Sequence, residues 1–339
     1  MTAEDAPLVT RPVAPRPGAY DGTLLTVAFA VAMYGPLILI GCVSFVVVYF
    51  GDTPVGEPAP DAKANPVAAL PHVVISLLAW AVPLSYLAGG VFSVAVLRRV
   101  VGPGWAREVG LRRLPLLHLG LALLALPAFM ILSDGLAVVV YRLFGMEQQL
   151  DHAGQLGELF AGFHPSFVVL AIGVGPGVVE ELWCRGFLAR GFVGRYGWIG
   201  GVGLTSLFFG LLHLLPPYVV VTAAMGACLH FLYACSRSLW VPICVHAANN
   251  GFAGLAAVGA VSVGGLERAM AANPAGMYAL AAVVLVSCGW AVWSARAVSA
   301  GPLGVIVPAA GVRDRAPRVV PTVLALVIGA GLLGLILSG

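Results

Sequence analysis

Apolar residues form long unbroken blocks along this chain of 339 residues, and they do not alternate with polar ones. Several blocks reach about 20 residues, roughly the helix length that crosses a ~30 Å hydrocarbon core. Because lipid cannot hydrogen-bond to a backbone, such blocks fold as helices. The pattern predicts an all-α, polytopic transmembrane bundle of about nine spans, with eight as the alternative count. The predicted spans are 24–50, 72–97, 114–141, 165–190, 197–215, 217–235, 239–260, 276–297 and 318–338.

The third block is the least regular, because Ser133, Asp134 and Gly135 interrupt it. We expect a helix break there, with the following part lying along the membrane interface. On that interpretation Asp134 is an isolated acid at a membrane boundary.

The predicted spans leave one geometric difficulty. With a rise of 1.5 Å per residue, His213 falls near the outer end of its helix and His246 near the inner end of its own. A fifth span that begins near residue 204 would bring the two closer in depth. We therefore expect part of 197–203 to be a turn or a closely packed helix start.

Composition supports the membrane assignment. Hydrophobic residues make up 60% of the chain and charged residues 10%, with a mean hydropathy of +0.97, whereas soluble proteins average about 25% charged residues. The net charge of +3 gives no indication of nucleic-acid binding. Lys63 is the only lysine, and this arginine bias suggests a bacterial genome rich in G and C. The six cysteines show no CxxC pairing, which favours free thiols.

Arginines in the connections predict the orientation. They gather in 98–113 and 294–318, and the opposite connections are mostly acidic. We expect a bacterial inner-membrane protein with a cytoplasmic N-terminus and an outside C-terminus. The predicted organisation has four parts: a disordered cytoplasmic arm at 1–22, transmembrane helices at 23–164, a catalytic core at 165–255 and further transmembrane helices at 256–339.

Ionisable residues inside membrane helices are expensive and usually functional, and the first cluster of them follows Pro176. Glu181 and Arg185 are four residues apart, so they share a helix face and can form an ion pair. Glu180 lies about 100° around the helix, outside that pair, where burial can suit its carboxylate to general-base chemistry. The alternative is a helix end whose charges are solvated.

Two later helices carry the other polar clusters. Phe209 and His213 are four residues apart, as are His246 and Asn250. A lone histidine such as His213 is more often a packed core residue, and Asn249 faces away as a helix-to-helix contact. Together, however, a carboxylate, two imidazoles and an amide can form a hydrolytic centre, in which a base activates water and donors stabilise an oxyanion.

The order and spacing of these clusters resemble the CAAX protease and bacteriocin-processing family (CPBP, also called Abi) of intramembrane proteases. The family pattern is EExxxR, FxxxH and HxxxN. This chain has Glu180-Glu181-xxx-Arg185, Phe209-xxx-His213 and His246-xxx-Asn250 within about 165–255. Cys184 stands where an aromatic residue is common.

The resemblance implies an endopeptidase that hydrolyses a peptide bond in a membrane-associated protein or peptide. Glu180 with His213 would activate water, and His246 with Asn250 would stabilise the oxyanion. Glu181, Arg185 and Phe209 would support them.

No cofactor is required on this interpretation. Zinc stays open, with Glu180, His213 and His246 as its ligands, although the chain has no HExxH helix. The implied partners are membrane lipid and a peptide or membrane-protein substrate, without nucleic acid. A transporter and a non-catalytic immunity or scaffolding protein remain the alternatives.

Overall fold

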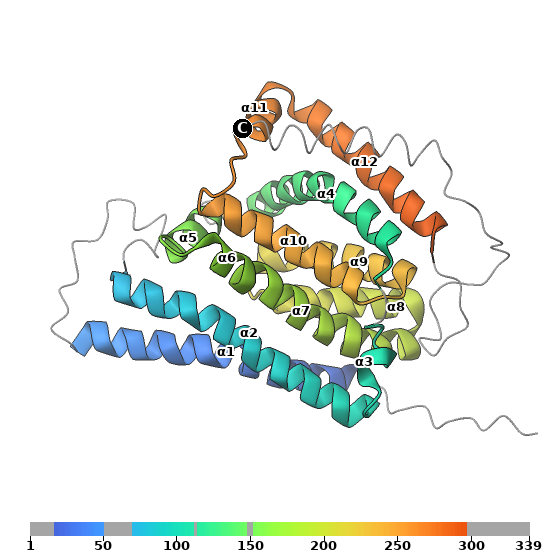
Figure 1. Ribbon diagram of the computed structural model, residues 1–339, viewed down its shortest axis with the longest axis horizontal. Helices are drawn as coiled ribbons and strands as arrows, with labels where there is room; N and C mark the ends of the chain where they lie inside the picture. The colour runs from blue at the N-terminus through green and yellow to red at the C-terminus, as the bar shows by residue number, and fades with distance from the viewer. Residues whose placement is uncertain (1–16, 51–69, 112–113, 148–151, 297–339) are drawn as a thin grey trace, which may run out of the picture.

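The computed structural model describes residues 17–50, 70–111, 114–147 and 152–296. All regular structure in these residues is helical, with no strand among them, which confirms the all-α class (Figure 1). Residues 1–16 of the predicted arm and the whole predicted ninth span lie outside the described residues. The arm was predicted too long, because the first helix begins at Ala19, where Asp21 in the first turn complements the helix dipole.

The described residues form twelve α-helices and two π-helices. In chain order they are α1 (Ala19–Phe50), α2 (His72–Val101), α3 (Trp105–Glu108), α4 (Leu116–Leu143), α5 (His152–Leu159), α6 (Pro165–Val168), the π-helical η2 (Val169–Val174), α7 (Gly175–Glu181), the π-helical η3 (Leu182–Leu188), α8 (Ala189–Leu211), α9 (Pro216–Ser236), α10 (Trp240–Ala257), α11 (Gly264–Ala272) and α12 (Pro274–Ser294). In Figure 1, α1 and α2 lie together along one edge and α12 along the other, with α7 and α10 between them.

Six segments of the described chain are long and apolar enough to cross a membrane. They are Ala19–Ser44, His72–Val101, Leu116–Leu143, Pro165–Leu211, Pro216–Ser236 and Pro274–Ser294. α10 has 18 residues, but its histidine and asparagines lower its hydropathy. The predicted count of nine is therefore not confirmed.

The segment Pro165–Leu211 is not one straight helix, because it folds back at Gly197. That glycine adopts a left-handed φ of 72°. The rings of Phe192 and Phe208 lie 5.4 Å apart, although sixteen residues of straight helix would separate them by roughly 24 Å. Gly201 also lies against the backbone of Val193, where a Cβ would come within 2.4 Å. The segment is thus a helical hairpin whose turn is Gly197.

The hairpin brings Glu181 and His213 to a similar distance from its turn, which the predicted spans did not. The first leg continues to residue 196, six residues beyond the predicted end of the fourth span. Glu181 and His213 are each sixteen residues from Gly197, so both lie about 24 Å from the turn. The predicted end of the fourth span at Arg190 was too early, because an arginine there resembles a membrane boundary. The guanidinium of Arg190 instead lies over α3, 2.6 Å from the Glu108 carbonyl oxygen.

α4 runs without a break through Ser133, Asp134 and Gly135, so the predicted interruption is wrong. Gly135 serves close packing, because a Cβ there would lie 2.6 Å from the ring of Tyr278 in α12. Asp134 is consequently in a continuous helix and not at a frayed end.

The main core surrounds η3, in which all seven residues are buried. The indole of Trp183 stacks on Phe29 of α1 at 4.6 Å and contacts Phe187 at 4.7 Å. Pro176 has no N–H to donate, and the wide π-helical turns of η2 end just before it. π-Helical turns are frequent at functional sites, and here they flank the two glutamates on either side.

Candidate active site

Close contact between α7 and α10 brings the first and third polar clusters together. A Cβ at Gly177 would lie 2.9 Å from the backbone nitrogen of Ala247, and one at Gly173 would lie 2.8 Å from the Ala247 carbonyl oxygen. Only glycine allows the two backbones to approach this closely. These glycines therefore serve close contact between the helices.

Glu181 is the centre of a buried ionic group. Its Oε1 accepts from Arg185 Nη1 at 2.6 Å and from His246 Nδ1 at 3.0 Å. Neither Glu181 nor Arg185 is exposed, and His246 is 1% exposed. Arg185 also donates to the Gly226 carbonyl at 2.6 Å, and its guanidinium lies 4.7 Å from the ring centre of Phe209. Glu181 is therefore neutralised and held by two partners.

The hydrogen bonds of α10 continue from this group. Asn249 donates to Oδ1 of Asn250 at 3.1 Å, and Asn250 Nδ2 lies 3.2 Å from His246 Nε2. These contacts are consistent with a neutral His246 that carries its proton on Nδ1 and accepts at Nε2. Asn250 then keeps one amide hydrogen for another acceptor.

Glu180 is in a different environment, although it is the next residue. It is 3% exposed, and Tyr86 of α2 donates to its Oε1 at 3.2 Å. Its Oε2 has no hydrogen-bond partner and its carboxylate no ion pair among the described residues. Tyr34 and Tyr218 lie close enough for the charge of Glu180 to act on their hydroxyls.

The second cluster reaches the site through Phe209. Its buried ring lies 5.3 Å from the ring of His213 and 5.6 Å from that of His246. His213 Nδ1 lies 3.0 Å from the Phe209 carbonyl oxygen, to which it can donate, so Nε2 remains as an acceptor. The His213 ring also meets Tyr218 edge-on at 5.3 Å.

His213, His246 and Asn250 line one cavity of about 450 Å³ between α4, α9 and α10. Tyr218 and Asp134 line the same cavity. Glu180 is not one of its lining residues. Tyr218, which lines the cavity, lies near Glu180. The structure thus brings the histidines and Asn250 to one space, with Glu180 beside it.

The family described as type II CAAX prenyl endopeptidase Rce1-like matches residues 162–252. That range contains all three polar clusters. These residues are similar to a CAAX protease core. The resemblance to the CPBP family is confirmed.

A curated relative agrees with the CAAX protease assignment. YdiL of Bacillus subtilis strain 168, whose name assigns it provisionally to the membrane peptidases, is 27% identical over 138 residues. The match covers 40% of this chain and 56% of the relative, so the chain spans about half the length of the curated relative it matches. No solved structure matches the chain. The apolar helices and this relative together identify an integral membrane protein.

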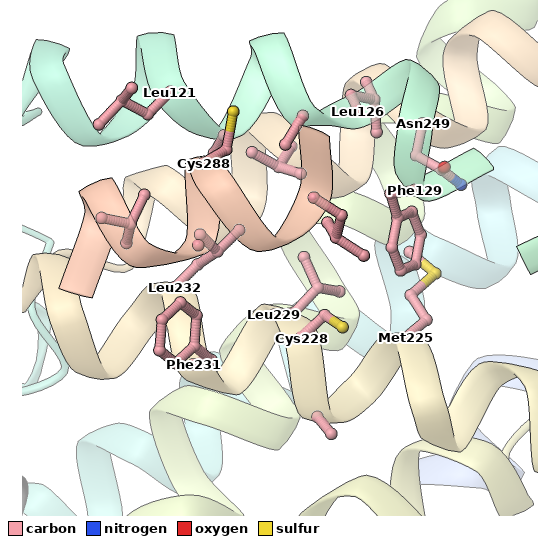
Figure 2. A pocket seen from close by; sticks show the side chains of 17 residues that line it. Leu121, Leu126, Phe129, Met225, Cys228, Leu229, Phe231, Leu232, Asn249 and Cys288 are labelled. Atoms are coloured by element: carbon pink, nitrogen blue, oxygen red, sulfur yellow. The ribbon is translucent and has the colours of Figure 1, made fainter. Parts of the chain in front are cut away.

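A second cavity adjoins the first, between α4, α9 and α12 (Figure 2). It has a volume of about 330 Å³ and an almost wholly apolar lining, with Leu126, Leu229 and Cys288 among its walls. Phe129, Met225 and Asn249 line both cavities. The two cavities therefore share part of one wall.

The described side chains do not fit a zinc site as they lie. Among the residues that the structure covers, no group of three or more His, Cys, Asp and Glu side chains could hold a metal ion. His246 is one of the predicted zinc ligands, but both of its ring nitrogens already have hydrogen-bond partners, Glu181 and Asn250. Zinc could bind Nε2 of His246 only if the contact with Asn250 were given up.

Sequence reasoning missed three residues around the candidate site, Tyr34, Tyr86 and Tyr218, and misplaced a fourth, Asp134. The tyrosines come from α1, α2 and α9. They gave no signal of a site, because tyrosine is also common in apolar helices as a core-packing residue. Asp134 was noticed but assigned to a membrane boundary. Its position in a charge-poor block was the available signal.

Proposed function

We propose that the chain is an intramembrane endopeptidase in which Glu180 is the general base and proton carrier. The observation that supports this most is the contrast between two adjacent buried carboxylates. Each has one oxygen with no hydrogen-bond partner among the described residues, but only Glu181 is paired, with Arg185 and His246. Glu180 has one hydrogen bond, from Tyr86, and no ion pair among the described residues. A buried carboxylate without a counter-ion is suited to accept and return a proton.

The proposed reaction begins with water between Glu180 and His213. Glu180 takes one proton from the water, while Nε2 of His213 accepts a hydrogen bond and holds the water in place. The hydroxide adds to the carbonyl carbon of the scissile peptide. The resulting oxyanion receives the remaining amide hydrogen of Asn250. Collapse breaks the C–N bond, and Glu180 passes its proton to the leaving amine.

In this scheme His246 acts through Asn250. Its ring is fixed by Glu181 on one side and meets the Asn250 amide on the other. Fixed dipoles aimed at a developing oxyanion account for a large share of catalysis in many hydrolases. No metal enters any step.

The direct test compares wild type with Glu180→Gln, which removes the base with little change of shape. We expect new protein termini in membranes that express wild type, and none of them with Glu180→Gln at equal abundance. Glu267→Gln, on the exposed surface of α11, is the matched control and should behave as wild type. Wild-type cleavage by Glu180→Gln would contradict the proposal.

The proposal includes a bacterial inner-membrane location with a cytoplasmic N-terminus, supported by the arginines of 98–113. Reporter enzymes fused to each end, one active only inside the cell and one only outside, test it. The opposite pattern of reporter activity would overturn the orientation and leave the catalytic proposal standing.

A further inference from the structure

Asp134 faces the cavity that holds the proposed catalytic side chains. Met130, Asp134, Ala137 and Tyr141 of α4 all line it, and their spacing of three or four residues defines one face of that helix. Asp134 is exposed in the folded chain, unlike the two glutamates of α7. A ligand in the cavity can therefore reach its carboxylate.

The carboxylate of Asp134 has no cationic partner in the part of the chain that the structure describes. The ion pairs there are Arg185–Glu181, His246–Glu181 and Arg190–Glu108. Neither lysine nor arginine lines the cavity. A carboxylate at such a position in a membrane protein is costly unless it is solvated or paired, so a cation that entered the cavity would find a favourable site.

Asp134 is also close to the proposed chemistry. It shares its cavity with His213 and Asn250. Tyr218 lines the same cavity, and its ring meets that of His213 edge-on at 5.3 Å. A cation bound at Asp134 would therefore lie in the same cavity as the side chains proposed to hold the water and the oxyanion.

We propose that Asp134 binds a cationic group of the substrate, an ammonium or a guanidinium, and selects peptides with that charge near the scissile bond. This inference rests on the proposed function. The charge can come from a lysine or arginine side chain or from the free amino terminus of a short peptide. In either case the substrate combines an apolar segment with one basic group.

The test uses the purified full-length chain in liposomes of phosphatidylethanolamine and phosphatidylglycerol. The probes are apolar peptides that carry Lys, Arg, Gln or Glu at one scanned position, each with a free and with an acetylated amino terminus. Wild type should cleave the best Lys or Arg peptide at least about tenfold faster in kcat/KM than its Gln counterpart, in line with close charge pairs across interfaces. Loss of the preference on acetylation alone would assign the charge to the terminus.

Three variants separate charge from structure. Asp134→Asn should lower kcat/KM for the Lys peptide to the value for the Gln peptide, and Asp134→Glu should restore the preference. Glu267→Gln should match wild type. Equal cleavage of Lys and Gln peptides by wild type, or an unchanged preference in Asp134→Asn, would overturn the subsite alone. No cleavage of any peptide by wild type would overturn the proposed function and the subsite with it.

Discussion

The hydroxyl of Tyr86 donates to Oε1 of Glu180 at 3.2 Å, across 94 residues of sequence. This bond orients the carboxylate and leaves its other oxygen without a partner among the described residues. Tyr86 is therefore a positioning residue for the proposed base, contributed by a helix outside the matched family segment.

Tyr86→Phe should lower kcat about tenfold with little change in KM, because an oriented base matters most in the transition state. Loss of one hydrogen bond should lower the unfolding free energy by about 1 kcal/mol. Peptide cleavage by purified protein gives the kinetic constants. Tyr20→Phe, on an exposed part of α1, is the control, and equal kinetics in both variants would exclude the positioning role.

Arg185→Met should destabilise the fold by about 3–5 kcal/mol, because it leaves Glu181 buried without its main counter-ion. Thermal unfolding in detergent measures the change. Glu108→Gln breaks the partly exposed contact with Arg190 at 3.6 Å and should cost less than about 1 kcal/mol. Similar losses of stability in the two variants would mean that burial does not make the Arg185–Glu181 pair stronger than the Arg190–Glu108 pair.

Gly177→Ala should separate α7 from α10, because its Cβ would lie 2.9 Å from the backbone of Ala247. We expect a loss of about 1–3 kcal/mol, as for overpacked cores. Gly203→Ala is the matched change, since a Cβ there meets nothing within 4 Å. It should be neutral or stabilising by up to about 1 kcal/mol. The order of the two unfolding temperatures checks the prediction.

Asn250→Ala should reduce kcat by about 100- to 1000-fold, the range for loss of one oxyanion donor. Asn249→Ala should have a smaller effect, because Asn249 acts only by orienting Asn250. Single-turnover cleavage by both variants gives the comparison. A larger loss for Asn249 than for Asn250 would contradict the assigned donor.

The helical class and the residues of the three clusters could be predicted because both depend on local pattern. Apolar blocks of membrane length specify helices, and four-residue spacing specifies a shared face. Glu181 and Arg185 lie as that spacing allows. The hydrogen bond between Glu181 and His246 of another helix was not predictable, because it depends on the close approach of Gly177 to Ala247.

Local sequence pattern could not predict the hairpin turn at Gly197 or the position of Asp134 in the cavity. Several glycines surround Gly197, and only the folded backbone distinguishes the one with positive φ. Arg190 resembled a boundary residue because its partner, Glu108, is 82 residues away. The sequence likewise cannot tell whether Asp134 meets water, headgroups or a cavity.

The second leg of the Gly197 hairpin ends early. From residue 198 to Leu211 it rises only about 20 Å, less than a ~30 Å hydrocarbon core, and α9 begins at Pro216. Between them Leu214 adopts a left-handed φ of 64°, and Tyr34 binds the Leu212 carbonyl. Non-helical backbone at such depth persists only inside protein or against water. Protein or water must therefore surround this turn, and water that reached it would be available for the peptide hydrolysis proposed above.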